Sequence, residues 1–205
     1  MPLFILLAIM LASYQLYYSQ PFFEGEPVVH GPGQIAPYVP DQYPLSEDAP
    51  PFQHNGFRII PLANFEVTAR VLHRYDYAPT VLFFGSPIDD LSPVDLALGW
   101  MAMSDERYLD QIEISQSKRW YKWRVEQFPI PRREIEINSA NMHFVPASSS
   151  IENKIKQVVK GDMVSFKGYL IKIEKGNWNW TSSLTRNDTG ARACETIWVE
   201  EFKIL

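Results

Sequence analysis

Residues 161–205, GDMVSFKGYLIKIEKGNWNWTSSLTRNDTGARACETIWVEEFKIL, carry the clearest structural signal in this chain. From Val164 to Leu170 apolar residues alternate with polar ones, which is the two-residue period of a half-buried β-strand. The period slips between Leu170 and Ile171, close to an interior glycine, Gly168. A slip beside a glycine predicts a bulge or a sharp bend in the strand.

The rest of this stretch predicts two further strands. Residues 175–177 (KGN) have the composition of a tight turn, and residues 178–181 alternate tryptophan with polar side chains. Residues 196–204 are rich in β-branched and aromatic side chains. Between them lies a polar segment, 182–195, which is longer than a hairpin needs and is therefore a candidate functional loop. The C-terminal third is expected to form a curled antiparallel sheet.

Upstream, the patterns are consistent with a mainly β body that begins near Arg58. Residues 65–76 alternate as one long strand, and residues 112–117 and 119–126 predict a pair of strands. Short helices are expected from three capping patterns, at 92–99 (SPVDLALG), at 104–106, and at 149–159, where Ser149 and Glu152 form a capping box. The expected fold is mainly β (α+β), a curled antiparallel sheet or small barrel over 58–205 with two or three short helices, preceded by an N-terminal hydrophobic helix.

Two N-terminal segments precede this body. Residues 3–11 are continuously apolar and no charge occurs before Glu24, so residues 1–20 are interpreted as a membrane anchor or signal-like helix. A cleaved signal peptide and a buried or partner-bound helix are the alternatives. Residues 21–57 contain eight of the sixteen prolines and predict an extended tether, with a partner-binding arm as the alternative.

Charge and cysteine content exclude several classes of protein. The net charge of −5 comes entirely from the N-terminal arm, because no Lys or Arg precedes Arg58 and the remainder is balanced. A neutral body argues against broad nucleic-acid binding. A single cysteine, Cys194, excludes an internal disulfide framework and multi-cysteine metal sites. No nucleotide, zinc-protease or serine-hydrolase motif is present, and no cofactor or metal is expected.

The run 118–133 (KRWYKWRVEQFPIPRR) is the main candidate for ligand binding. It interleaves basic and aromatic residues, and Trp120, Lys122, Trp123 and Arg124 would be able to stack on sugars or bases and contact phosphates. An ordinary half-buried strand, with one core face and one solvated face, explains the same pattern.

The second constellation combines Cys194 with His143 and Asp188. A thiol, an imidazole and a carboxylate are the components of a cysteine nucleophile. No local nucleophile signature supports this chemistry, and a buried structural cysteine is the alternative. In the same loop Arg186 and several hydroxyl groups form a candidate site for an anionic ligand.

Four strings, at residues 92–100, 116–124, 140–147 and 182–195, resemble a family of uncharacterised bacterial proteins with an N-terminal hydrophobic segment. The resemblance spans about residues 62–200 and implies a bacterial envelope setting, but it implies no activity and no site residues. A helix followed by GDxVxxxGxL and a final strand is also similar to small five-stranded barrels of the OB type.

These observations favour a non-catalytic binding or scaffold protein of the bacterial inner membrane, single-pass, with a periplasmic body. Its expected partners are another membrane-associated protein and, through residues 3–20, the lipid bilayer; nucleic acid is not expected as a partner. Two alternatives remain open: a hydrolase or transferase using Cys194 and His143, and a glycan- or nucleic-acid-binding module.

Overall fold

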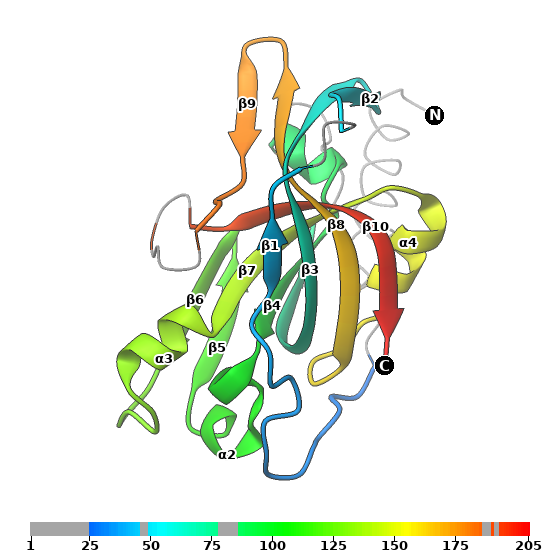
Figure 1. Ribbon diagram of the computed structural model, residues 1–205. Helices are drawn as coiled ribbons and strands as arrows, with labels where there is room; N and C mark the ends of the chain where they lie inside the picture. Colours follow the sequence, from blue (N-terminus) through cyan, green and yellow to red (C-terminus); the bar gives the residue numbers. More distant parts are fainter. Residues whose placement is uncertain (1–24, 46–48, 78–85, 186–189, 191–192) are drawn as a thin grey trace, which may run out of the picture.

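The computed structural model describes residues 25–45, 49–77, 86–185, 190 and 193–205 (Figure 1). The strands are β1 (Asp41–Tyr43), β2 (Phe52–His54), β3 (Phe57–Asp76), β4 (Val94–Gly99), β5 (Glu113–Ser117), β6 (Trp120–Arg124), β7 (Ser139–Pro146), β8 (Met163–Lys175), β9 (Trp178–Thr181) and β10 (Glu195–Ile204). The helices are short: η1 (Pro87–Asp90), η2 (Met101–Ser104), α2 (Glu106–Leu109), α3 (Arg132–Ile137) and α4 (Ser149–Ile155). The fold is therefore mainly β, as the sequence predicted.

Five strands pair in a closed cycle, which we call the closed sheet. β3 pairs with β4, β4 with β7, β7 with β10, β10 with β8, and β8 returns to β3 over a long register. Four of these pairs are antiparallel, but β10 runs parallel to β7. The expectation of a purely antiparallel sheet is wrong for this pair. Helix α4 connects β7 to β8, and β10 then pairs antiparallel with β8 on the edge of β8 that does not contact β3. In this arrangement β10 runs in the same direction as β7.

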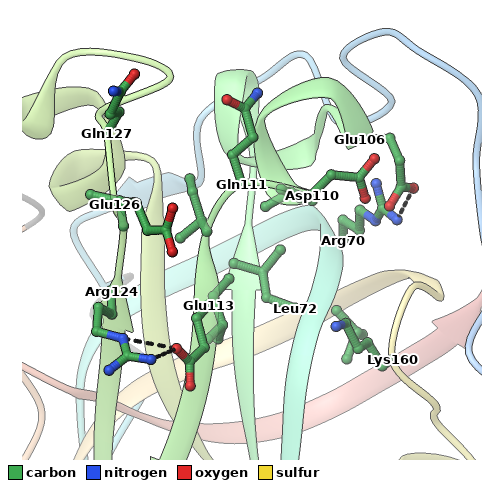
Figure 2. Close-up of a pocket in the computed structure, with 15 residues that line it drawn as sticks. Arg70, Leu72, Glu106, Asp110, Gln111, Glu113, Arg124, Glu126, Gln127 and Lys160 are labelled. Atoms are coloured by element: carbon green, nitrogen blue, oxygen red, sulfur yellow. Dashed lines mark hydrogen bonds and ion pairs between the residues drawn. The ribbon is translucent and has the colours of Figure 1, made fainter.

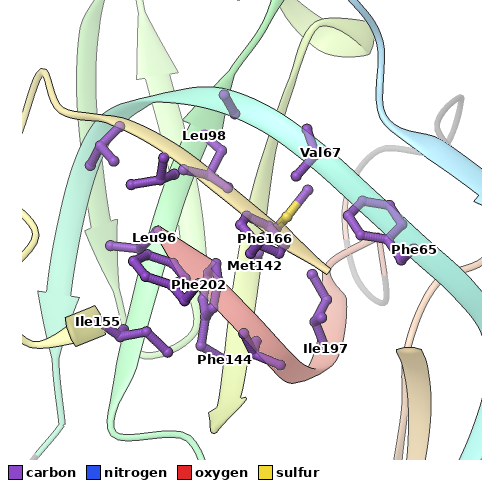
Figure 3. Packing of buried hydrophobic residues seen from close by; sticks show 14 of the residues in the cluster. Phe65, Val67, Leu96, Leu98, Met142, Phe144, Ile155, Phe166, Ile197 and Phe202 are labelled. Atoms are coloured by element: carbon purple, nitrogen blue, oxygen red, sulfur yellow. The ribbon is translucent and has the colours of Figure 1, made fainter. Parts of the chain in front are cut away.

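The interior of the closed sheet is filled by apolar side chains from every strand (Figure 3). The aromatic rings of Phe65, Phe144 and Phe202 pack around Phe166, with centroid distances of 4.9–6.2 Å. Trp100, which follows β4, is 1% exposed and belongs to the same cluster. This core accounts for the alternating pattern of β3 and β8, since every second residue faces inward.

The bend predicted near Gly168 is present, but the extra residues lie in the strands beside β8. Register shifts occur in β3 between Pro61 and Ala63 and in β10 between Val199 and Glu201. Gly168 is packed so closely that a Cβ atom built on it would lie 1.8 Å from the carbonyl oxygen of Trp198. The glycine is needed for this close approach of β10 to β8.

The helix predicted over residues 92–99 is wrong, because Val94–Gly99 forms strand β4, in which every residue is buried. Its Ser-Pro-Val-Asp start resembles a helix cap, but a short apolar run fits a buried strand equally well. Pairing with β3 on one side and β7 on the other decides the outcome. The helical turn that precedes this strand is η1, which begins at Pro87, five residues before the predicted helix start at Ser92.

The other predicted helices are closer to the structure. Asp105 caps α2, as expected near residue 104. Helix α4 is capped by Ser148, one residue before the predicted cap, and has seven residues in place of about ten. Helix α3 and strand β7 were not predicted from the sequence. The hairpin of β5 and β6 is confirmed, and its turn places Lys118 and Arg119 at positive φ.

The segment predicted as a tether contacts the body throughout its described part. β1 and β2 pair with β3, and Ala36 is 1% exposed within the core. Val28 N–H donates to the Lys160 carbonyl at 2.8 Å. Residues 25–45 and 49–57 are therefore packed, because their backbone groups find partners on the body in spite of the many prolines.

The predicted membrane segment, residues 1–20, lies outside the described residues. Among the described residues, no helix is long and apolar enough to span a bilayer.

Candidate functional site

Polar residues gather on the outer face of β4, β7 and β10. Asp95 and His143 lie directly opposite each other on β4 and β7, and Thr196 of β10 lies opposite His143 on the other side. All three are fully buried. They are buried because the β5–β6 hairpin and the β8–β9 hairpin both fold over this face, so the outward-facing residues of three central strands form a second, polar interior.

Arg119 joins the β5–β6 hairpin to this polar face. Its guanidinium contacts Asp95 Oδ1 at 2.5 Å and Asp89 Oδ1 at 2.6 Å, and donates to the Ser92 carbonyl at 2.7 Å. Its carbon Cζ lies 3.4 Å from the ring centroid of Tyr77. Only 9% of the Arg119 side chain is exposed. A guanidinium bound by two carboxylates and an aromatic face fixes the hairpin turn against the closed sheet.

The Asp95 carboxylate is kept ionised by its neighbours. Burial alone would raise the pKa of Asp95, but the adjacent His143 imidazole, the Arg119 guanidinium and a 3.0 Å hydrogen bond from the Tyr77 hydroxyl outweigh burial and lower this pKa. The pKa of Tyr77 is raised in turn by burial and by the charge of Asp95. Tyr77 therefore remains a hydrogen-bond donor to Asp95 across the physiological pH range.

His143 is held inside this network. Its Nδ1 lies 2.9 Å from Asp95 Oδ1, although the angles fall outside hydrogen-bond geometry. Its ring packs edge-on against Trp180 at a centroid distance of 5.4 Å. Nε2 has no hydrogen-bonding partner among the described residues. The imidazole is fully buried, so a substrate does not reach it in this conformation.

Cys194 directly precedes β10, and its sulfur is 3.8 Å from Asn141 Nδ2 and 3.7 Å from the Arg119 carbonyl oxygen. Cys194 thus lies two residues before Thr196, the residue opposite His143, but the structure shows no hydrogen bond between thiol and imidazole. The remaining predicted loop residues, Arg186 and Asp188, lie outside the described residues.

A cavity of about 590 Å³ opens between the two hairpins, and we call it the groove. Its walls are Lys118, Arg119 and Trp120 from the turn of the β5–β6 hairpin and Asn179, Trp180 and Thr181 from β9; Ser86, Gly190 and Cys194 complete the lining. Trp120 is 47% exposed, an unusual state for an indole. The groove therefore presents two indole rings, a lysine, and amide and hydroxyl groups.

A second cavity of about 630 Å³, the side pocket, continues from the groove, since Trp120, Gly190 and Cys194 line both. The predicted binding residues Trp120, Lys122, Trp123 and Arg124 all line it. Trp123 also packs with Tyr121 and Val125 into a small core, as the alternative interpretation of this strand required. One strand thus supplies both core residues and cavity walls.

Most cations around these cavities are already paired. Arg119 contacts two aspartates, Arg124 contacts Glu113 at 2.6 Å, and Arg132 contacts Glu136 at 2.8 Å. Within the described part of the chain, Lys118 and Lys122 make no ion pair, and they alone contribute unpaired positive charge to the lining.

A further cavity, of about 970 Å³, lies at the open end of the β5–β6 hairpin, between the hairpin and β3 (Figure 2). Ion pairs of opposite charge line it, Arg70 with Glu106 and Arg124 with Glu113. The described residues contain no group of three or more His, Cys, Asp or Glu side chains that would hold a metal ion.

Sequence reasoning missed Asp95, Arg119 and Trp180 as parts of the site. Asp95 fell within the predicted helix, and Arg119 was one of several basic residues in a run. A charged residue in an otherwise apolar strand, as in VDLALG, was the available signal, because such a charge needs a partner.

Comparisons with protein-family models, with curated proteins and with solved structures found no match for this chain.

Proposed function

We propose that this protein is a membrane-anchored, non-catalytic binding module of the bacterial envelope, and that the groove holds a glycan strand. The order of strands in the closed sheet supports a binding role. β3, β4, β7, β8 and β10 pair in the order 1-2-3-5-4-1, with a helix between the third and fourth strands, as in barrels of the OB type. Such barrels bind oligonucleotides and oligosaccharides at the face of strands 2 and 3, between loops 1–2 and 4–5.

The groove occupies the corresponding position. Ser86 belongs to the connection between the first two strands, β3 and β4, while Asn179, Trp180 and Thr181 belong to the connection between β8 and β10. The single observation that carries the proposal is the pair of indole rings, Trp120 and Trp180, on the walls of one open cavity. Flat aromatic faces stack on the apolar faces of sugar rings, and the amide and hydroxyl groups beside them match sugar hydroxyls.

The charges favour a glycan over a nucleic acid. A polyanion needs several unpaired cations, whereas the arginines at the groove and side pocket are paired with carboxylates. Lys118 and Lys122 suffice for an occasional acidic group on a sugar chain.

The test is a calorimetric titration of the full chain, in lipid nanodiscs, with a chito-oligosaccharide pentamer. Trp120→Ala should weaken binding about 5- to 150-fold, corresponding to about 1–3 kcal/mol of stacking by analogy with nucleic-acid bases. The matched control is Tyr38→Ala, which removes an aromatic side chain that is 79% exposed and does not line the groove.

Parallel titrations with a single-stranded oligothymidine separate the two polymers. If Lys118 and Lys122 bound phosphates, affinity for DNA would fall about sevenfold between 50 and 200 mM salt, from a slope of about −0.7 for each cation. Binding of the uncharged pentamer should be insensitive to salt. Tight, salt-dependent binding of DNA with no glycan binding would overturn the glycan assignment, and hydrolysis of an activated ester that is lost in Cys194→Ala would replace it with the hydrolase alternative.

The membrane setting rests on the uncharged segment that precedes Glu24. Full-length protein should stay in the membrane fraction at alkaline pH, and an associated membrane protein should co-purify in mild detergent after brief crosslinking. Release into the soluble fraction would remove the anchor from this proposal without affecting the groove.

A further inference from the structure

Four exposed aliphatic residues gather where the described chain begins and where it ends; we call them the aliphatic patch. They are Val28 (38% exposed), Val29 (79%), Ile204 (41%) and Leu205 (68%). Figure 1 shows the start of the described chain beside the C-terminus, at the end of the molecule opposite the β8–β9 hairpin. Exposed aliphatic residues that cluster are a sign of an interaction surface.

The backbone holds the two parts of the patch near each other. Val28 N–H donates to the Lys160 carbonyl, and Leu205 N–H donates to the Met163 carbonyl, each at 2.8 Å. Both acceptors lie at the entry to β8, three residues apart. Gly161 has a φ of +94° and lies so close to Val28 that a Cβ atom would be 1.8 Å from the Val28 carbonyl oxygen. The position of Val28 on the body is thus well determined.

This attachment leaves little chain between the body and the proposed anchor. Residues 25–45 pack on the body, so the expected spacer of residues 21–57 shortens to the few residues before Gly25. Five residues reach at most about 18 Å when fully extended. If residues 3–20 span a bilayer, Gly25 lies within that distance of the membrane surface. Val28 and Val29 of the aliphatic patch are only a few residues farther along the chain.

We propose that the aliphatic patch rests on the lipid interface and that the body lies against the membrane; this inference depends on the proposed anchor. Lys203 directly precedes Ile204, and the backbone carbonyl of Lys160 accepts the hydrogen bond from Val28. Neither lysine forms an ion pair in the described part of the chain. They are suited to contact lipid phosphates. In this orientation the β8–β9 hairpin, which forms one wall of the groove, points away from the bilayer (Figure 1).

Spin labelling of the full chain in nanodiscs of phosphatidylethanolamine and phosphatidylglycerol tests the contact. In a Cys194→Ser background, single cysteines are introduced by Val29→Cys in the patch, by Asn177→Cys at the exposed tip of the β8–β9 hairpin, and by Leu6→Cys in the proposed anchor. The measurement is the accessibility of each nitroxide to oxygen, which concentrates in lipid, relative to a water-soluble nickel chelate.

The expected result is a ratio of oxygen to nickel accessibility that is severalfold higher at position 29 than at position 177. A water-like ratio at position 29 together with a lipid-like ratio at position 6 would overturn the docking proposal and leave the anchor intact. A water-like ratio at position 6 would overturn the anchor, and docking with it. Dipolar broadening between labels at position 29 would show that a second copy covers the patch, which also overturns the proposal.

Discussion

Substitution of Arg119 by alanine should destabilise the fold strongly, because it removes the cation from a buried network. The guanidinium contacts Asp95, whose side chain is 1% exposed, and Asp89, whose side chain is 15% exposed. Removing one partner of a buried ion pair leaves an uncompensated charge and costs about 3–5 kcal/mol. For a chain of this size, this corresponds to a fall in melting temperature of roughly 6–20 °C.

The β5–β6 hairpin provides a matched control. Arg124 also contacts a carboxylate, that of Glu113, but the two side chains are 82% and 64% exposed. Water screens such a pair, so Arg124→Ala should cost only about 0–1 kcal/mol. The two variants therefore differ in burial, while residue type and hairpin are the same.

The assay is urea unfolding of the full chain in mild detergent, followed by tryptophan fluorescence and by far-ultraviolet circular dichroism. Arg119→Ala should lower the unfolding midpoint by about 1–5 M with an unchanged slope, taking typical urea slopes of about 1–3 kcal/mol/M. If Arg119→Ala and Arg124→Ala differ by less than about 1 kcal/mol, Arg119 does not join the hairpin to the closed sheet in the way described. The polar face would then have another source of stability.

Three further predictions concern stability. Gly168→Ala should lower the free energy of unfolding by about 1–3 kcal/mol or more, because a Cβ would lie 1.8 Å from the Trp198 carbonyl oxygen. The control is Gly31→Ala, where a Cβ would have no atom within 4 Å, so this variant should be nearly neutral in the same urea titration. The pKa of Asp95 is lower in the folded chain than its ordinary value of 3.8, so the ionised carboxylate stabilises the folded state above that pH, and this contribution is lost as pH falls below it. The decrease in the free energy of unfolding from pH 5 downward should therefore be smaller in Asp95→Asn than in the unmodified chain. Tyr121 donates to Ser139 Oγ at 3.0 Å and burial raises its pKa to about 12, so Tyr121→Phe should cost about 0.5–1.5 kcal/mol and remove one late-titrating tyrosine from the absorbance titration at 295 nm. An unchanged titration curve would contradict that assignment.

Much of the local structure was predictable from alternation and turn chemistry. The part of β3 from Phe65 onward, strands β8 and β10, the β5–β6 hairpin and the turn at Gly176 follow from patterns that involve only neighbouring residues. The aromatic and basic residues of β6 were also identified, because their character is visible in the run itself. Helix 92–99 failed, since six buried residues carry no periodicity that separates a strand from a helix.

The sequence by itself therefore determined the mainly β class, the positions of β8, of β10 and of the larger part of β3, and the residues of β6 that line the side pocket, because these depend on side-chain periods within one segment. Only the tertiary structure decided the closed pairing of β3 with β8, the parallel pair of β7 and β10, and the packing of residues 25–45 and 49–57 on the body. It also decided the network of Asp95, His143 and Arg119, which come from segments far apart in the chain. These three side chains come into contact because of strand register and the positions of the two hairpins. No local pattern of residues encodes either of these features.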